Sequence, residues 1–394
     1  MSDKPESSKT QLEEDIFEPL FQKDFLSQLP VEVAYRIITY LTPRDLMNCA
    51  GAHDGHANDC LQVHSGRIVT GSDDNTLRVF NVDDAQLAFT LTGHMGHIRT
   101  TLVSDDGKYI VSGAYDRTVR VWCGQTGAQR HVLQGHTSEV WCMGLHGTTL
   151  VSGSFLDQTL RVWDIIDGKC LQILTGDLGM VRCVQFDGIR VVSGALDGTV
   201  KVWNVQTGEC LQTLTGHTRQ VDSLLFEPER DLVVSRSLDK TIRVWDIRGG
   251  TCIAIPISGE SVYRYRHYGM QLRGNSLVAC YTGSDVGVWD IRDGGSCIHV
   301  HLQGVNGHAL NITSLQLLDS GLLITSSEDG SVKLWDVDKG IFVRDLVRLQ
   351  PGSRNPWRRR TLAIILLTYL MSNFLSVLIT VWEMFDPASL WKPG

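Results

Sequence analysis

Short apolar runs alternate with polar turns along most of the chain, and one arrangement of them recurs seven times. Each copy holds two β-rich runs joined by a tight turn that contains Gly or Asp, as at 109–112 and 118–122. Such a pair predicts a β-hairpin. The copies close on an aromatic residue that recurs every 40–46 residues: Phe80, Trp122, Trp163, Trp203, Trp245, Trp289 and Trp335. A repeat of this length is typical of the blades of a β-propeller.

Two further apolar segments in each repeat complete a four-stranded blade. One precedes the hairpin, as at 181–186, and one follows it, as at 210–214. A single sheet of this kind cannot bury both of its faces, so the copies must pack radially around a central channel. The pattern therefore predicts an all-β fold, with a propeller of seven recognisable blades over residues 51–348.

Gly-His pairs precede four of the hairpins, and an Asp and a Trp follow each pair at fixed distances. On these residues the repeats resemble the WD-repeat family. The resemblance implies that His, Ser, Asp and Trp are linked within a blade, which would provide the partners that a buried carboxylate needs. Three copies carry all four of these residues: His94, Ser112, Asp116 and Trp122; His136, Ser152, Asp157 and Trp163; and His217, Ser235, Asp239 and Trp245. Three copies depart from the pattern, with Asp177 in place of a His, Phe80 in place of a Trp, and a shortened turn at 283–289 in the sixth copy, so we expect these blades to be looser.

Composition narrows the range of functions. A net charge of −8 over 394 residues leaves no basic excess to neutralise phosphates, which disfavours nucleic acid as a partner. The ten cysteines are spread over the repeats without a Cys-x-x-Cys pair, so we expect reduced thiols and neither a metal site nor another cofactor. The chain has no Gly-x-x-x-x-Gly-Lys-Ser/Thr phosphate loop and no Gly-x-Ser-x-Gly nucleophile turn, so we expect no enzyme activity. Residues 1–24 are polar and acidic, so we expect no signal peptide there but a disordered lead in a cytoplasmic or nuclear protein.

A short segment with helical spacing, residues 25–50, lies before the repeats. Its apolar residues fall on one helical face, and Pro30 suits a first helical turn. This pattern fits any small helical hairpin, but the order Leu29-Pro30-x-Glu32 followed by Ile37 and Leu41 resembles the start of an F-box. The F-box is expected to be partial, because the chain runs almost directly from Ala50 into the repeats.

An F-box before WD repeats is similar to the substrate receptors of SCF-type ubiquitin ligases, in the group that recognises phosphodegrons in cyclin-E-like substrates. The resemblance implies a non-catalytic subunit that captures phosphorylated or acidic proteins for ubiquitination and proteasomal degradation. Binding of the SCF adaptor, and of the cullin through it, would fall to five residues: Leu29, Pro30, Glu32, Ile37 and Leu41. The alternative is a WD-repeat scaffold or adaptor without a ligase role.

The same resemblance places substrate-binding residues on the propeller. Receptors of this group bind phosphate with arginines that follow the apolar residue opening the innermost strand, or that lie in the turn after the next strand. At the first kind of position this chain has Arg99, Trp141, Arg182 and Asp222, and at the second it has Arg117 and Phe155-Leu156. The implied substrate-binding residues are Arg99, Arg117, Trp141, Phe155 and Arg182.

Two expected pocket arginines are absent and are replaced by Trp141 and by Phe155 or Leu156. Each lost charge-assisted hydrogen bond should cost about 1.5–3 kcal/mol, so phosphate binding should be weaker or its peptide specificity changed. For Arg99 and Arg182 the alternative is a charged propeller rim without a dedicated ligand.

The C-terminal residues 349–394 depart from the repeat. Arginines at 358–360 precede an uncharged apolar run at 361–382, which predicts a basic linker and a hydrophobic helix long enough to span a bilayer. Localisation at the cytosolic face of a membrane, as a tail-anchored protein, is therefore an alternative. A helix packed on the propeller and a segment read in error are the other interpretations.

Overall fold

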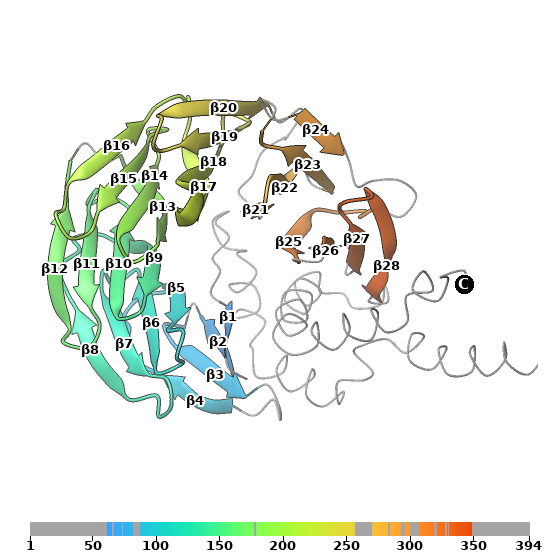
Figure 1. The fold of residues 1–394 in the computed structure, drawn as a ribbon. Coiled ribbons are helices and arrows are strands. Elements are labelled where there is room, and N and C mark those ends of the chain that lie inside the picture. The colour runs from blue at the N-terminus through green and yellow to red at the C-terminus, as the bar shows by residue number, and fades with distance from the viewer. Residues whose placement is uncertain are drawn as a thin grey trace, which may run out of the picture.

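The computed structural model describes residues 61–64, 67–72, 74–81, 87–176, 179–256, 270–282, 284–292, 296–299, 307–318, 321–327, 329 and 331–348. Within these ranges, 28 strands form seven four-stranded antiparallel sheets that follow one another in chain order (Figure 1). The seven predicted blades of an all-β propeller are confirmed. The acidic lead, the partial F-box with Leu29, Pro30, Glu32, Ile37 and Leu41, and the C-terminal helix lie outside the described residues.

Each blade consists of four consecutive strands, which pair in sequence order. Blade 1 consists of β1 (Leu61–His64), β2 (Arg67–Gly71), β3 (Leu77–Asn81) and β4 (Leu87–Leu91), and blade 2 consists of β5 (Ile98–Val103), β6 (Tyr109–Ala114), β7 (Val119–Cys123) and β8 (Gln129–Leu133). Blade 3 consists of β9 (Val140–His146), β10 (Thr149–Ser154), β11 (Leu160–Asp164) and β12 (Lys169–Leu174), and blade 4 consists of β13 (Val181–Phe186), β14 (Arg190–Ala195), β15 (Val200–Asn204) and β16 (Cys210–Leu214). Blade 5 consists of β17 (Val221–Glu227), β18 (Leu232–Ser237), β19 (Thr241–Asp246) and β20 (Thr251–Pro256); blade 6 consists of β21 (Met270–Arg273), β22 (Ser276–Thr282), β23 (Asp285–Asp290) and β24 (Ser296–His299); and blade 7 consists of β25 (Ile312–Leu317), β26 (Leu322–Ser327), β27 (Ser331–Asp336) and β28 (Ile341–Arg348).

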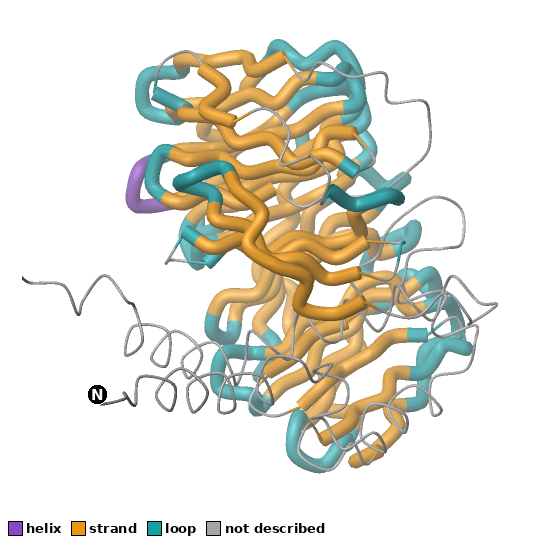
Figure 2. The backbone as a smooth tube through the Cα atoms, turned by 90° about the vertical axis from the view of Figure 1, so that its right-hand side faces the viewer, coloured by secondary structure: helices purple, strands orange, loops and turns teal. Residues whose placement is uncertain are grey.

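The first strand of each blade is the innermost one. Successive first strands, from β1 to β25, contact one another around the centre of the molecule (Figure 1). Turns gather on two opposite faces (Figure 2). We call the face on which the inner strands begin the upper face and the opposite one the lower face. The lower face includes a 3₁₀ turn between β17 and β18, Pro228–Arg230.

Neighbouring blades share apolar layers that hold the array together. Between blades 2 and 3, Val111 and Val121 pack with Val140, Leu150 and Trp163, all of them buried. Since side chains alternate between the two faces of a strand, each of blades 2–6 contributes to one layer on either side. Equivalent layers join the other successive pairs of blades. This packing, rather than contacts within single sheets, is the core of the fold.

Chains of hydrogen bonds from Trp to Asp tie the upper ends of four blades. In blade 3, Trp163 Nε1 donates to Ser152 Oγ over 2.8 Å, and the same hydroxyl lies 2.7 Å from His136 Nε2. His136 Nδ1 lies 2.8 Å from Asp157 Oδ2, so this nitrogen is the donor to the carboxylate. Blades 2 and 5 repeat the arrangement with the residues predicted for them. Blade 7 has it too, with a threonine in the serine position: His308, Thr325, Asp329 and Trp335.

The order Asp, His, Ser resembles a catalytic triad, but the burial of these chains argues against a catalytic role. Ser152 is 0% exposed, and its oxygen already accepts the indole N–H of Trp163. Burial alone would raise the pKa of Asp157, but hydrogen bonds from His136 and from Thr137 N–H hold it below its usual range. These chains therefore fasten the upper turn of each blade to its second and third strands.

Two of the three copies that depart from the repeat still place an aromatic side chain in the apolar layers. Trp203 in blade 4 donates to Ser193 Oγ over 3.0 Å, although Asp177, which replaces the histidine, lies outside the described residues. Phe80 is fully buried in blade 1. The Trp position of a blade thus contributes mainly by filling the layer between blades.

On the lower face, Asp or Asn caps the turn after the third strand in most blades. In blade 3, Asp164 Oδ1 accepts the N–H of Ile166 over 2.7 Å, and in blade 4 Asn204 Oδ1 accepts that of Gln206 over 2.8 Å. Blade 2 has Cys123 at this position. Hydrogen bonds from the Thr126 side chain and from backbone N–H groups of the turn lower the pKa of Cys123 to about 6.

We therefore expect Cys123 to be alkylated by iodoacetamide at a rate that is half-maximal near pH 6, against about pH 8.5 for an ordinary thiol. Mass spectrometry of the Cys123 peptide across a pH series measures this rate. Cys142 is an internal control, because burial raises the pKa of its thiol to about 12 and the folded protein should leave it unlabelled. A half-maximal rate for Cys123 near pH 8.5 would contradict the expectation.

Candidate functional site on the channel rim

Four side chains project from equivalent points on the inner strands of neighbouring blades. Arg99, Trp141, Arg182 and Asp222 are the second residues of β5, β9, β13 and β17. In each blade the pairing with the next strand skips this residue: in blade 4, Val181 pairs with Ala195 and residue 183 with residue 194. A β-bulge re-aims the side chain of the extra residue. The four residues thus belong to the upper rim of the channel rather than to the layers between blades.

Three side chains from three blades stack on one another, and we call Arg99, Trp141 and Arg182 the rim cluster. The guanidinium carbon of Arg99 lies 3.5 Å from the centroid of the Trp141 ring, and that of Arg182 lies 4.8 Å from it. The Phe155 ring stacks on Trp141 at 4.6 Å with an interplanar angle of 25°. Each cation–π contact contributes about 0.5–2 kcal/mol. Trp141 therefore holds two guanidiniums close together.

The two arginines of the cluster are buried in the protein. Arg99 is 4% exposed and Arg182 is 6% exposed. Burial lowers the pKa of Arg182, and the neighbouring Asp222 carboxylate opposes that shift. Water screens a charge poorly in such surroundings, so an anionic group on the rim would interact strongly with these guanidiniums.

Phe155 lies directly after β10, at the start of the turn on the upper face, which brings its ring close to Trp141. Its N–H donates to Glu139 O over 3.1 Å, and Tyr115 N–H donates to His97 O over 3.0 Å at the same place in blade 2. The Tyr115 ring lies 6.0 Å from the Arg99 guanidinium carbon. Tyr115 was not among the residues predicted from the sequence, although it is the first residue of the turn after the second strand, as Phe155 is.

Arg117 is not brought into the cluster. It is exposed, and its backbone has a left-handed φ of 69°, as has Lys240 at the same turn position of blade 5. Within the described part of the chain, Arg117 makes no hydrogen bond or ion pair with the cluster. Its binding role stays a prediction.

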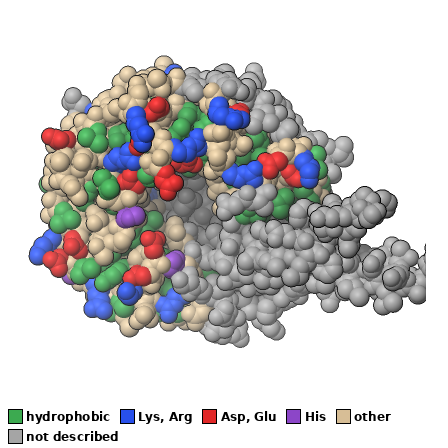
Figure 3. All heavy atoms as spheres, viewed as in Figure 1, with side chains coloured by type: hydrophobic (Ala, Val, Ile, Leu, Met, Phe, Trp, Pro, Cys, Tyr) green, Lys and Arg blue, Asp and Glu red, His purple; other side chains and the backbone are tan. Residues whose placement is uncertain are grey.

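Blade 5 adds an ion pair beside the cluster. Arg236 Nη2 lies 3.9 Å from Asp222 Oδ2, and both side chains are about nine-tenths buried. Arg236 was not among the site residues predicted from the sequence. The signal was Val234-Ser-Arg-Ser, where blades 1–4 have Gly in place of the Arg. Figure 3 shows the opposite, lower face of the molecule, which is also hollowed at its centre and has basic and acidic side chains around the hollow.

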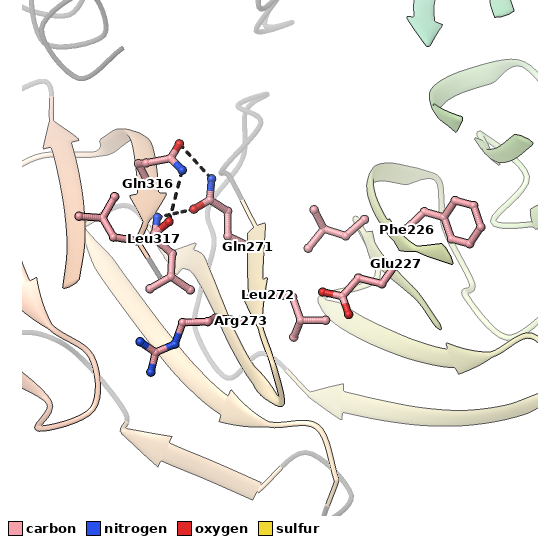
Figure 4. A pocket seen from close by; sticks show the side chains of 9 residues that line it. Phe226, Glu227, Gln271, Leu272, Arg273, Gln316 and Leu317 are labelled. Atoms are coloured by element: carbon pink, nitrogen blue, oxygen red, sulfur yellow. Dashed lines mark hydrogen bonds between the residues drawn. The ribbon is translucent and has the colours of Figure 1, made fainter. Parts of the chain in front are cut away.

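A separate cavity of about 320 Å³ lies at the other end of the inner strands β17, β21 and β25 (Figure 4). In its wall, Gln271 Nε2 donates to Gln316 Oε1 over 3.2 Å, and Gln271 Oε1 accepts the N–H of Leu317. None of the predicted site residues lines this cavity.

The described residues contain no group of His, Cys, Asp and Glu side chains arranged to hold a metal ion. Among those same residues, no helix is long and apolar enough to cross a bilayer, and the predicted span at 361–382 lies outside them.

The WD domain, G-beta repeat family matches residues 47–81, 85–123, 127–164, 168–204, 208–246 and 295–336, which is more than half of the sequence. The chain belongs to the WD-repeat family. The matched ranges omit most of blade 6, yet this WD-repeat protein forms β21, β22 and β23 there.

Three known proteins are similar to this WD-repeat chain. F-box/WD repeat-containing protein sel-10 of Caenorhabditis elegans is 50% identical over 313 residues, which are 78% of this chain and 51% of sel-10. Cell division control protein 4 of Saccharomyces cerevisiae is 39% identical over 84 residues, 21% of this chain and 11% of that protein. The chain therefore spans about half the length of sel-10 and a smaller part of the yeast protein. The crystal structure of the computationally designed Ika8 protein overlaps with a TM-score of 0.61 at 33% identity, over 72% of this chain and 85% of that one.

Proposed function

We propose that this WD-repeat chain is the substrate-recognition subunit of an SCF-like ubiquitin ligase, and that its upper rim binds phosphorylated or acidic protein motifs. The observation that carries the proposal is the rim cluster, in which Arg99 and Arg182 from different blades meet on one aromatic ring. The planar donor fork of arginine suits phosphate and carboxylate groups. In this proposal the chain carries out no chemical step itself and presents a captured protein for ubiquitination in the cytoplasm or nucleus.

The ligase part of the proposal is supported by two further observations. The chain is 50% identical to a protein named for an F-box and WD repeats. Its own residues 25–50 resemble the start of an F-box, with Leu29 and Pro30 among the proposed contacts to the adaptor. A WD-repeat scaffold that binds the same motifs without adaptor or cullin is the second candidate, because the F-box pattern is partial.

Affinity purification of the full chain from cells tests the ligase role. We expect the SCF adaptor and the cullin to co-purify with the wild-type chain. The double variant Leu29→Ala with Ile37→Ala should lose both, while it still binds an anionic peptide as the wild type does. If neither partner co-purifies with a wild-type chain that binds such a peptide, the scaffold function holds instead.

A further inference from the structure

In blade 5 the rim carries a negatively charged residue, Asp222, at the position where blades 2 and 4 carry an arginine. We propose that this carboxylate restricts the site to peptides that carry a single anionic group, with a neutral hydrogen-bond donor beside it. The proposal rests on the proposed function, since it concerns the same rim. It assigns Asp222 as a specificity-determining residue and Arg236 as the residue that positions it.

The position of Asp222 makes it a neighbour of any group bound at the cluster. It occupies the bulge on β17 that Arg182 occupies on β13, and these two inner strands pack side by side. Its carboxylate is close enough to favour the charged form of Arg182. A peptide that crosses the rim from blade 2 to blade 5 therefore meets two guanidiniums first and a carboxylate next.

The Arg236 side chain stands where three other blades leave no room for one. A Cβ at Gly113 would come within 2.7 Å of Val140 Cγ1, and one at Gly194 would come within 2.7 Å of Val221 Cγ1. In blade 5 an arginine fits this position and faces Asp222. Because buried ion pairs add little stability compared with apolar packing, recognition explains this pair better than stability does.

The ion pair with Arg236 leaves the Asp222 carboxylate able to accept further hydrogen bonds. The distance of 3.9 Å to Arg236 Nη2 is longer than a hydrogen bond. Asp222 Oδ1 is buried and accepts no hydrogen bond from any residue that the structure describes. A buried carboxylate oxygen favours a ligand that donates to it, such as a hydroxyl, an amide or a backbone N–H.

A second phosphate or carboxylate at this point has the opposite effect. It would face the Asp222 carboxylate in surroundings that screen charge poorly, and like charges so placed disfavour a competing ligand. Arg236 offsets this repulsion only in part, because its nearest guanidinium nitrogen lies 3.9 Å from Asp222 Oδ2, beyond hydrogen-bonding distance. The rim thus prefers peptides with one anionic residue over those with two close together.

Fluorescence anisotropy with the full chain tests the proposal. The reference probe is a peptide with one phosphoserine. In the other probes, each nearby position on either side of that residue carries in turn a second phosphoserine, a serine or an alanine. For the wild type we expect the second phosphate to weaken binding at least tenfold at one or more positions. At those positions serine should bind better than alanine.

Variants of Asp222 then assign the effect to this carboxylate. Asp222→Asn should bind the doubly phosphorylated peptide at least tenfold more tightly than the wild type does, and the singly phosphorylated peptide within about threefold. Asp222→Glu keeps the charge and should keep the discrimination. Asp167→Asn removes an exposed carboxylate on the lower face and should change neither affinity.

The outcomes separate this inference from the function on which it rests. If the wild type binds doubly phosphorylated peptides as tightly as singly phosphorylated ones at every position, or if Asp222→Asn leaves their ratio unchanged, Asp222 is not the selector and the anion site stands. If no phosphorylated peptide binds the wild type, both the proposed function and this inference are overturned.

Discussion

Replacement of Arg182 by alanine is expected to weaken binding of a singly phosphorylated peptide by roughly tenfold to a hundredfold. Loss of a charge-assisted hydrogen bond costs about 1.5–3 kcal/mol, which corresponds to that range. The buried setting of this arginine, 6% exposed beside Trp141, places the effect toward the upper end. Arg182→Lys should recover only part of the affinity, because a lysine keeps the charge but not the planar fork.

Anisotropy titrations at two salt concentrations measure this effect. Arg130→Ala is the matched control, because Arg130 is exposed on the outer strand β8, away from the rim. It removes the same charge and should change the affinity less than threefold. Equal affinities of the wild type and Arg182→Ala for the phosphorylated peptide would contradict the assignment of the cluster.

Replacement of Trp163 by alanine is expected to destabilise the propeller by about 3–5 kcal/mol. Trp163 is 2% exposed in the layer between blades 2 and 3, and its Nε1 donates to Ser152. The substitution leaves a large cavity beside Val140 and removes the donor at one end of the hydrogen-bonded chain. Most of the loss comes from packing, because a single hydrogen bond contributes only about 1 kcal/mol.

Denaturant unfolding followed by circular dichroism measures the change in stability. Ile173→Ala is the control, because Ile173 lies on the outer strand β12 and is 43% exposed. A surface substitution of this kind should cost about 0.5 kcal/mol or less. Unfolding of Trp163→Ala at the same denaturant concentration as the wild type would show that the layers between blades do not hold the fold.

The blades could be predicted from the sequence because their signals are local. A hairpin with a tight turn and a closing aromatic residue is visible in each repeat, and the 40–46-residue spacing admits few other folds. The resemblance to SCF substrate receptors implied one shared position for Arg99, Trp141 and Arg182 in three blades. The structure adds that a bulge lies at that point and that Trp141 touches both arginines.

The remaining features of the rim depend on contacts between segments that sequence spacing does not relate. The pair of Asp222 and Arg236 forms across two strands, next to a bulge that shifts their register. Nothing in the sequence indicates the left-handed backbone at Arg117, because most residues other than glycine avoid that conformation. The exposed position of its side chain therefore became clear only from the structure. Cys123 looked like any other reduced thiol in the repeat, until the turn around it showed the donors that stabilise a thiolate.

A crystal structure of the chain with a singly phosphorylated peptide bound tests the central claim most directly. The account predicts that the phosphate lies within hydrogen-bonding distance of both Arg99 and Arg182 on the upper rim, with a peptide donor directed at Asp222. A phosphate bound at the lower end of the inner strands, beside Gln271 and Gln316, or away from the channel altogether, would contradict it.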